Sequence, residues 1–210
     1  GELDGQSVVM INCVGARVPE RTYCSRFCCM TAVKNATLIK ESNPNSKVFI
    51  LHRDLMAYGE DFENYYRKSM EQGVRYIRYD LEKPPQVMGN GKAEKVKVWH
   101  QLRGREIEFP VDMVVLTTPL IPRADNEEIS KMLKVPLSEQ GFFLEAHLKL
   151  MPVEFATDGI YLCGSARWPT DIAEGISQAY AAASKALIPM RTGYVKPEAI
   201  TSSVSEDICS

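Results

Sequence analysis

The N-terminal part of the chain alternates between short apolar runs and longer segments with a helical period. The run at residues 7–13 is mostly apolar and β-branched, as buried strands are, and residues 47–51 and 74–79 are expected to form two further strands. Between them, residues 24–41 and 61–72 carry apolar side chains three and four positions apart, which predicts helices. Strands joined through helices by connections of a few residues are parallel. The sequence therefore predicts an α/β fold with a Rossmann-like, doubly wound parallel sheet.

The pattern changes in the middle of the chain. Residues 87–100 and 101–109 alternate apolar and polar positions around a turn, which predicts an antiparallel meander with one solvated face. Residues 113–117 predict a further buried strand. The elements expected after it are a short helix at 126–133, a strand at 158–164 and a long helix at 170–187, followed by a linker from Pro189 onward.

Composition excludes several classes of protein. Of 210 residues, 45% are hydrophobic and 25% charged, which is ordinary for a globular chain. The net charge of -2 gives no support for a nucleic-acid or anionic-membrane surface. The apolar runs are too short to span a bilayer, and the chain opens without a signal peptide. We therefore expect a cytoplasmic protein without a membrane span.

Six cysteines are the unusual feature of this composition. A cytoplasmic chain keeps its thiols reduced, which favours metal, cluster or redox chemistry over disulfides. Four of them fall within 17 residues in a C-x10-C-x3-C-C pattern, namely Cys13, Cys24, Cys28 and Cys29. On the expected helix, Cys24 and Cys28 share a face, and amides at a helix start stabilise thiolates. Cys163 is expected to be a buried strand residue.

Two kinds of centre take four sulfurs, a zinc ion and an iron–sulfur cluster. Zinc sites commonly use C-x2-C pairs, and two adjacent cysteines fit one small tetrahedron poorly. A cubane offers iron at separated corners, which suits the adjacent pair better. The spacing favours a cluster and leaves zinc, or reduced cysteines in a core, as open alternatives.

Four segments together carry a resemblance to a known family. They are residues 13–17 (CVGAR), 23–34 (YCSRFCCMTAVK), 141–150 (GFFLEAHLKL) and 169–172 (PTDI). The chain resembles the A-type subunits of the heterodisulfide reductase family from about Val8 to Leu187, and the Y-C-S-R-x-C-C motif is highly specific. The resemblance implies an iron–sulfur flavoprotein with a thioredoxin-reductase-like core, in which the four cysteines bind a [4Fe-4S] cluster beside FAD.

The resemblance also implies a division of the chain. Residues 1–115 correspond to the dinucleotide-binding-like lobe that carries the cysteine motif. Residues 116–190 correspond to the C-terminal half of an FAD-binding lobe, and residues 191–210 to a linker or tail. No G-x-G-x-x-G motif follows any predicted strand. We therefore hypothesise that the cluster occupies the sheet edge where a dinucleotide would otherwise bind.

Further site residues follow from the same resemblance. The candidates to bind FAD lie at the glycine turn and on the long helix, and they are Gly164, Ser165, Asp171, Ile172 and Gln178. Asp171 has a second interpretation as the cap of a core helix. Lys34 is the candidate to stabilise reduced flavin near its N5 atom, with a solvent-facing lysine as the alternative.

The expected function is electron relay between FAD and the iron–sulfur clusters of partner subunits, as part of an oxidoreductase complex. The isolated chain is expected to be inactive on its own. Electron donors of the ferredoxin, hydrogenase or dehydrogenase type are compatible with it. Cys209 follows an acidic stretch that, in the family, opens a ferredoxin-type motif, so we expect a fragment of a longer protein or a split subunit. The alternative is a non-catalytic, zinc-binding or cofactor-free Rossmann-like interaction or regulatory domain.

Overall fold

The computed structural model describes residue 3 and residues 5–195, which form two compact units. The first contains the described residues up to Arg123 together with Trp168–Asp171. The second contains Ala124–Arg167 and the described residues from Ile172 onward. The assignment of these units to a dinucleotide-binding-like lobe and half of a flavin lobe, with a boundary near residue 115, stays a prediction.

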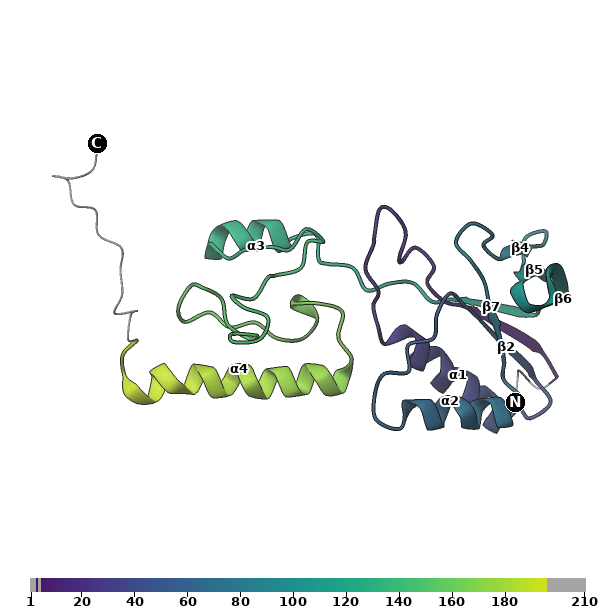
Figure 1. Cartoon of the computed structure of the whole chain (residues 1–210), viewed down its shortest axis with the longest axis horizontal. Coiled ribbons are helices and arrows are strands. Elements are labelled where there is room, and N and C mark those ends of the chain that lie inside the picture. Colours follow the sequence, from purple (N-terminus) through teal and green to yellow (C-terminus); the bar gives the residue numbers. More distant parts are fainter. Residues whose placement is uncertain (1–2, 4, 196–210) are drawn as a thin grey trace. The chain divides into compact units, whose positions relative to one another are not determined.

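A parallel sheet with strand order β3-β2-β1-β7 forms the centre of the first unit (Figure 1). The buried strand β1 (Ser7–Ile11) lies between β2 (Lys47–His52) and β7 (Met113–Leu116). At the edge, β3 (Arg75–Arg78) pairs with β2, and all of these pairings are parallel. The predicted strands and their parallel arrangement are confirmed.

Two helices cover one face of this sheet. They are α1 (Cys28–Ser42), which joins β1 to β2, and α2 (Phe62–Glu71), which joins β2 to β3. Val8 and Met10 of β1 point to this face and pack among α1 residues such as Val33. Because side chains alternate along a strand, Val9 and Ile11 point to the opposite face.

An antiparallel sheet covers that opposite face. Its strands are β4 (Gln86–Met88), β5 (Lys95–His100) and β6 (Arg105–Pro110), in sequential order, with the short helix η1 (Gln101–Arg103) between the last two. Val96 and Val98 of β5 are fully buried against the parallel sheet. The predicted meander and the α/β, Rossmann-like fold class are therefore confirmed.

The helix expected from residue 24 begins instead at Cys28. Arg26 has a φ of 62°, a left-handed conformation that no α-helix accommodates, and the Phe27 N–H bonds to the Ser25 carbonyl at 2.7 Å. Cys24 consequently lies in the loop before α1. The prediction that Cys24 and Cys28 share a helix face is wrong.

The second unit contains α3 (Asn126–Leu133), η2 (Gly164–Ala166) and α4 (Ile172–Thr192). The strand expected at 158–164 is wrong, since this segment forms only an isolated antiparallel bridge between Tyr161 and Glu154. A strand requires a continuous partner, which the described residues of this unit do not supply at that position.

The long helix continues past Pro189, where a linker was expected, and ends at Thr192. A proline within a helix leaves the carbonyl four residues earlier without its donor, which is that of Lys185. The Tyr161 hydroxyl donates to this carbonyl at 3.4 Å, so the helix tolerates the proline. Residues 196–210, with Cys209, lie outside the described residues.

One side of α4 is strongly apolar and open to solvent within its unit. The exposed residues recur at helical spacing, and they are Ile172, Ile176, Tyr180, Leu187 and Met190. Ala182 is the buried residue of the helix. None of the helices in the described part of the chain has the length and apolarity needed to cross a bilayer.

Candidate metal centre

The candidate site begins where β1 ends, at the carboxyl edge of the parallel sheet. The Asn12 N–H still bonds to the Leu51 carbonyl of β2, at 2.9 Å. The next residue, Cys13, has a φ of 62° and turns the chain out of the sheet. The carboxyl edge of parallel strands is where α/β proteins place their ligands.

A short hairpin returns the chain from Cys13 to the remaining three cysteines. The Arg17 N–H bonds to the Tyr23 carbonyl at 3.3 Å, and Val18 pairs with Arg21 at its tip. The Tyr23 hydroxyl donates to the Leu120 carbonyl at 2.9 Å, which fixes the returning arm. The hairpin thus brings Cys24 back toward the strand end that carries Cys13.

The loop before α1 supplies hydrogen bonds to two of the sulfurs. The Arg26 backbone N–H donates to Cys24 Sγ at 3.2 Å, a bond that the left-handed conformation of Arg26 makes possible. The Ser25 side chain and the backbone of Cys28 itself form hydrogen bonds to the Cys28 sulfur. Ser25 is 1% exposed, so its hydroxyl is held in the interior.

The segment after β2 supplies the donors for the other two sulfurs. The Cys13 sulfur forms a hydrogen bond with the backbone of Arg53, and the Cys29 sulfur with the backbone of Met56. The Cys29 thiol also donates to the Asp54 carbonyl at 3.5 Å. Each of the four sulfurs therefore has at least one hydrogen bond from the surrounding chain.

Burial raises the pKa of three of these thiols. It raises the pKa of Cys29 to about 11, and it also raises the pKa of Cys13 and of Cys28. Neighbouring cysteines raise these pKa values further, because thiolates repel one another. The four sulfurs thus lie within one another's electrostatic reach, and four thiolates there require a cationic centre to be stable.

An ion-pair network fixes the loop that follows β2. Arg17 Nη2 lies 2.8 Å from Asp54 Oδ2, and Arg78 Nη2 lies 3.4 Å from Asp54 Oδ1. Arg53 Nη1 donates to the Arg17 carbonyl at 2.6 Å. The hydrogen bond from Arg17 lowers the pKa of Asp54, so the carboxylate stays ionised. The network ties the Cys13 hairpin to the segment that bonds Cys29.

Asn12 is buried next to Cys13, and its side-chain amide makes no hydrogen bond with the described residues. It is 0% exposed, and neither Nδ2 nor Oδ1 has a hydrogen-bond partner in the described part of the chain. A buried amide without a partner costs free energy, which points to a group that binds here. Separately, no three His, Cys, Asp or Glu side chains among the described residues converge tightly enough to hold a single metal ion.

The donor set fits a sulfur-ligated cluster in its chemistry. It offers four cysteines, hydrogen bonds to each sulfur and an unused buried amide. Sequence reasoning identified the cysteines but missed Arg53, Met56 and Asn12. A usable signal for Arg53 and Met56 was their position just after β2, since the carboxyl ends of parallel strands share one edge.

The predicted flavin residues fall into separate surroundings. The Gly164 N–H donates to Gln178 Oε1 at 2.7 Å, so these two form one contact within the second unit. Ser165 and Ile172 are exposed. Asp171 belongs to the first unit, where the Tyr58 hydroxyl lies 3.4 Å from its Oδ2 atom. Lys34 lies on α1, and its side chain is exposed.

Known proteins that are similar in sequence belong to heterodisulfide reductases, although no family model matches the chain. The A-type iron-sulfur subunit of the CoB–CoM heterodisulfide reductase of Methanocaldococcus jannaschii is 43% identical over 207 residues, which cover 96% of this chain. The A-type subunit of the ferredoxin:CoB-CoM heterodisulfide reductase of Methanosarcina acetivorans is 39% identical over 183 residues, or 85% of this chain.

The chain is homologous to a segment of the A-type subunits of heterodisulfide reductase. This confirms the resemblance carried by the cysteine motif. The match covers 31% of the length of the Methanocaldococcus protein and 22% of that of the Methanosarcina protein. These relatives therefore extend well beyond the region that this chain represents.

Solved structures with the same fold are thioredoxin reductases. That of T. acidophilum has a TM-score of 0.54 at 20% identity, covering 88% of this chain and 53% of its own. That of Lactococcus lactis has a TM-score of 0.57 at 18% identity, covering 89% and 53%. These matches confirm the thioredoxin-reductase-like fold expected from the sequence.

Proposed function

We propose that this chain forms the electron-transfer part of an iron–sulfur flavoprotein that corresponds to the A-type subunit of heterodisulfide reductase. In this proposal Cys13, Cys24, Cys28 and Cys29 bind one [4Fe-4S] cluster. The observation that carries the proposal is the hydrogen bonding of all four sulfurs by the surrounding chain. Hydrogen bonds to cluster sulfurs set the reduction potential of such centres.

When bound, the cluster supplies a one-electron redox centre. The residues of the chain hold it and control its surroundings. The Arg26 amide offsets negative charge at Cys24, and the Arg17 guanidinium does so at Cys13. Cys29 is 4% exposed, so the protein interior keeps water from this corner of the site.

FAD is the second cofactor in the proposal. Gly164 supports it, because its φ of 63° and the open space around its Cα atom permit close approach of a ligand. Gln178 orients this glycine, and Ser165 and Ile172 extend the proposed surface within the second unit. Asp171 stays a separate candidate in the first unit. We further assign to Lys34 the role of stabilising reduced flavin, for which its exposed ammonium group is available.

The proposal includes partners and a compartment. The apolar side of α4 is suited to pack against further protein, either the rest of a flavin-binding lobe or other subunits of the complex. Electrons would pass from FAD through the cluster to clusters of those subunits. The five described cysteines are all free thiols, which supports a cytoplasmic location.

Reconstitution with iron and sulfide under anaerobic conditions tests the cluster assignment. The chain is expected to acquire a broad visible absorption band that bleaches on reduction by dithionite. Serine substitution at any one of Cys13, Cys24, Cys28 and Cys29 is expected to reduce or abolish the band. Cys163→Ser is the matched control, because Cys163 belongs to the second unit.

Two results would contradict the assignment. One is a band that survives all four single substitutions, which would place the chromophore elsewhere. The other is a colourless protein that retains zinc through the same four cysteines. That second result would favour the alternative function, a non-catalytic domain in which the cysteines serve structure.

A further inference from the structure

A cavity in the first unit lies between the edges of its two sheets, away from the cysteines. It has a volume of about 560 Å³, within the range of small-molecule sites. Its walls come from β2 and β3 on one side and from η1 and β6 on the other. It includes Arg75, the first residue of β3, whereas Cys13 lies beyond the carboxyl end of β1.

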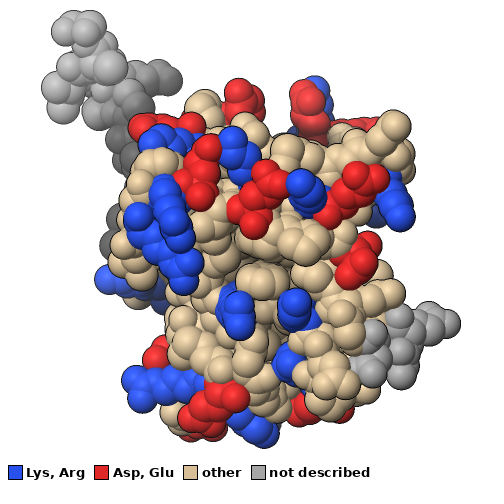
Figure 2. Space-filling model, turned by 90° about the vertical axis from the view of Figure 1, so that its right-hand side faces the viewer, with Lys and Arg blue, Asp and Glu red and all other residues tan. Residues whose placement is uncertain are grey.

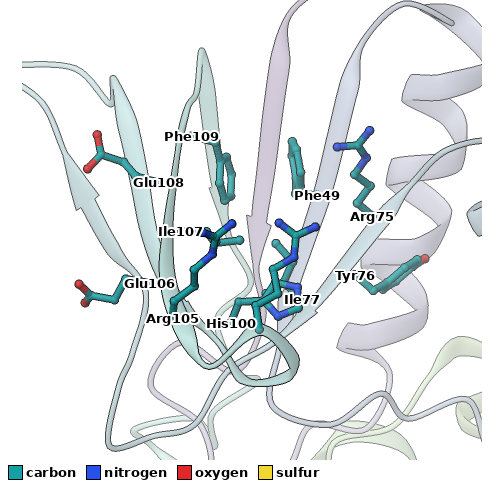
Figure 3. Close-up of a pocket in the computed structure, with 11 residues that line it drawn as sticks. Phe49, Arg75, Tyr76, Ile77, His100, Arg105, Glu106, Ile107, Glu108 and Phe109 are labelled. Carbon is teal, nitrogen blue, oxygen red and sulfur yellow. The ribbon is translucent and has the colours of Figure 1, made fainter.

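The inner wall of this cavity is apolar and aromatic. Phe49 of β2 and Phe109 of β6 stack with their ring centroids 4.5 Å apart. Ile77 and Ile107 extend the same wall (Figure 3). Phe49 and Ile77 are buried, whereas Ile107 and Phe109 are partly exposed, so these last two form the apolar surface that a ligand can reach.

The outer part of the cavity is cationic. Arg75, Arg103 and Arg105 line it, and the imidazole of His100 lies among the lining residues. The side chains of Arg103 and Arg105 make no hydrogen bond or ion pair with any described residue. Arg75 lies with its guanidinium carbon 5.7 Å from the centre of the Phe49 ring. Figure 2 shows basic side chains gathered near the centre of one face of the molecule.

The nearby acidic residues do not neutralise this charge. Glu106 and Glu108 alternate with Arg105 along β6, so their carboxylates point to the other side of the strand (Figure 3). There Glu106 pairs with Lys97 and Glu108 pairs with Lys95, each at 2.7 Å. The arginines are therefore available to a ligand from solution.

We propose that this cavity binds a small organic anion with a flat apolar body, such as an aromatic phosphate, sulfonate or carboxylate. The guanidinium groups of Arg103 and Arg105 pair with the anionic group, for which their planar fork of donors is suited. The ring of the ligand packs on the partly exposed side chains of Ile107 and Phe109. This site is independent of the cluster and of the proposed flavin surface.

Isothermal titration calorimetry of the chain with 1-naphthyl phosphate tests the proposal. We expect saturable binding at one site per chain. Arg103→Gln and Arg105→Gln are each expected to weaken it about tenfold or more, because each removes charge-assisted hydrogen bonds. Arg67→Gln is the matched control, since Arg67 is an exposed arginine of α2 outside the cavity, and it should leave binding unchanged.

Two further probes separate the parts of the ligand. Inorganic phosphate and uncharged 1-naphthol are each expected to bind at least about tenfold more weakly than 1-naphthyl phosphate, since each lacks one half of the recognised group. Absence of saturable binding, or equal weakening by Arg67→Gln, would overturn the proposal. So would inorganic phosphate binding as tightly as 1-naphthyl phosphate, because the aromatic wall would then contribute nothing.

Discussion

Replacement of Asn12 by leucine tests two effects of its buried amide. One is the effect on the free energy of unfolding, and the other is the effect on the midpoint potential of a bound cluster. Both polar atoms of this side chain are buried without a partner among the described residues. Asn12 follows the last residue of β1 and its N–H still bonds to β2, so the alternation of the strand, continued by one residue, puts it on the same face as Met10, the face that α1 covers. The first turn of α1 carries Cys28 and Cys29, so the amide is expected to donate to the cluster.

The expected changes in stability and in midpoint potential follow from the burial of the Asn12 amide. A buried polar group without a partner costs about 1–3 kcal/mol, and leucine has a similar volume without polar atoms. In the cluster-free chain, Asn12→Leu is therefore expected to leave the free energy of unfolding unchanged or to raise it by about 1 kcal/mol. In the cluster-loaded chain, loss of a hydrogen bond worth about 1.4 kcal/mol more to the reduced than to the oxidised cluster lowers the midpoint potential by about 60 mV.

Urea unfolding of the cluster-free chain and a potentiometric titration of the reconstituted chain measure the two effects. Thr37→Val is the matched control, because the Thr37 hydroxyl is also buried without a partner among the described residues but lies further along α1. It should leave the midpoint potential unchanged. An Asn12→Leu chain that loses more than about 2 kcal/mol without the cluster, or keeps the original potential with it, would refute the reasoning.

Two more substitutions test the supports of the site and of the second unit. Asp54→Asn removes the ion pair with Arg17. Because this pair is partly exposed, the free energy of unfolding should change by less than about 1 kcal/mol. The cluster band should nevertheless decay faster in air, and an unchanged decay rate would show that the network does not protect it. Tyr161→Phe removes the hydroxyl that donates to the Lys185 carbonyl and should lower stability by about 1 kcal/mol in thermal unfolding. Tyr194→Phe, at a residue that is 66% exposed, should have no such effect, and equal losses from both would contradict the role of Tyr161.

The core of the first unit was predictable because its signals are local. Strand β1 is a continuous apolar run, and Gly73 follows α2 with a φ of 91°, as a glycine that ends a helix does. The start of α1 was not predictable, because the left-handed conformation of Arg26 depends on the loop around it. The expected strand at 158–164 failed for a similar reason, since pairing depends on distant residues.

The candidate site was predictable only in part. The cysteine motif is visible in one stretch of sequence, whereas the hydrogen bonds to Cys13 and Cys29 come from the segment after β2. The cavity between the sheets was likewise predictable only in part. The alternation of Arg105 with Glu106 can be read along β6, but only the folded chain brings Arg105 into the same cavity as Phe49 of β2.

The metal content of the anaerobically reconstituted chain tests the central claim most directly. Iron, acid-labile sulfide and zinc are measured together on the same sample. We predict about four iron and about four sulfide per chain and no stoichiometric zinc, as expected for a [4Fe-4S] centre. About one zinc per chain without sulfide would contradict the account.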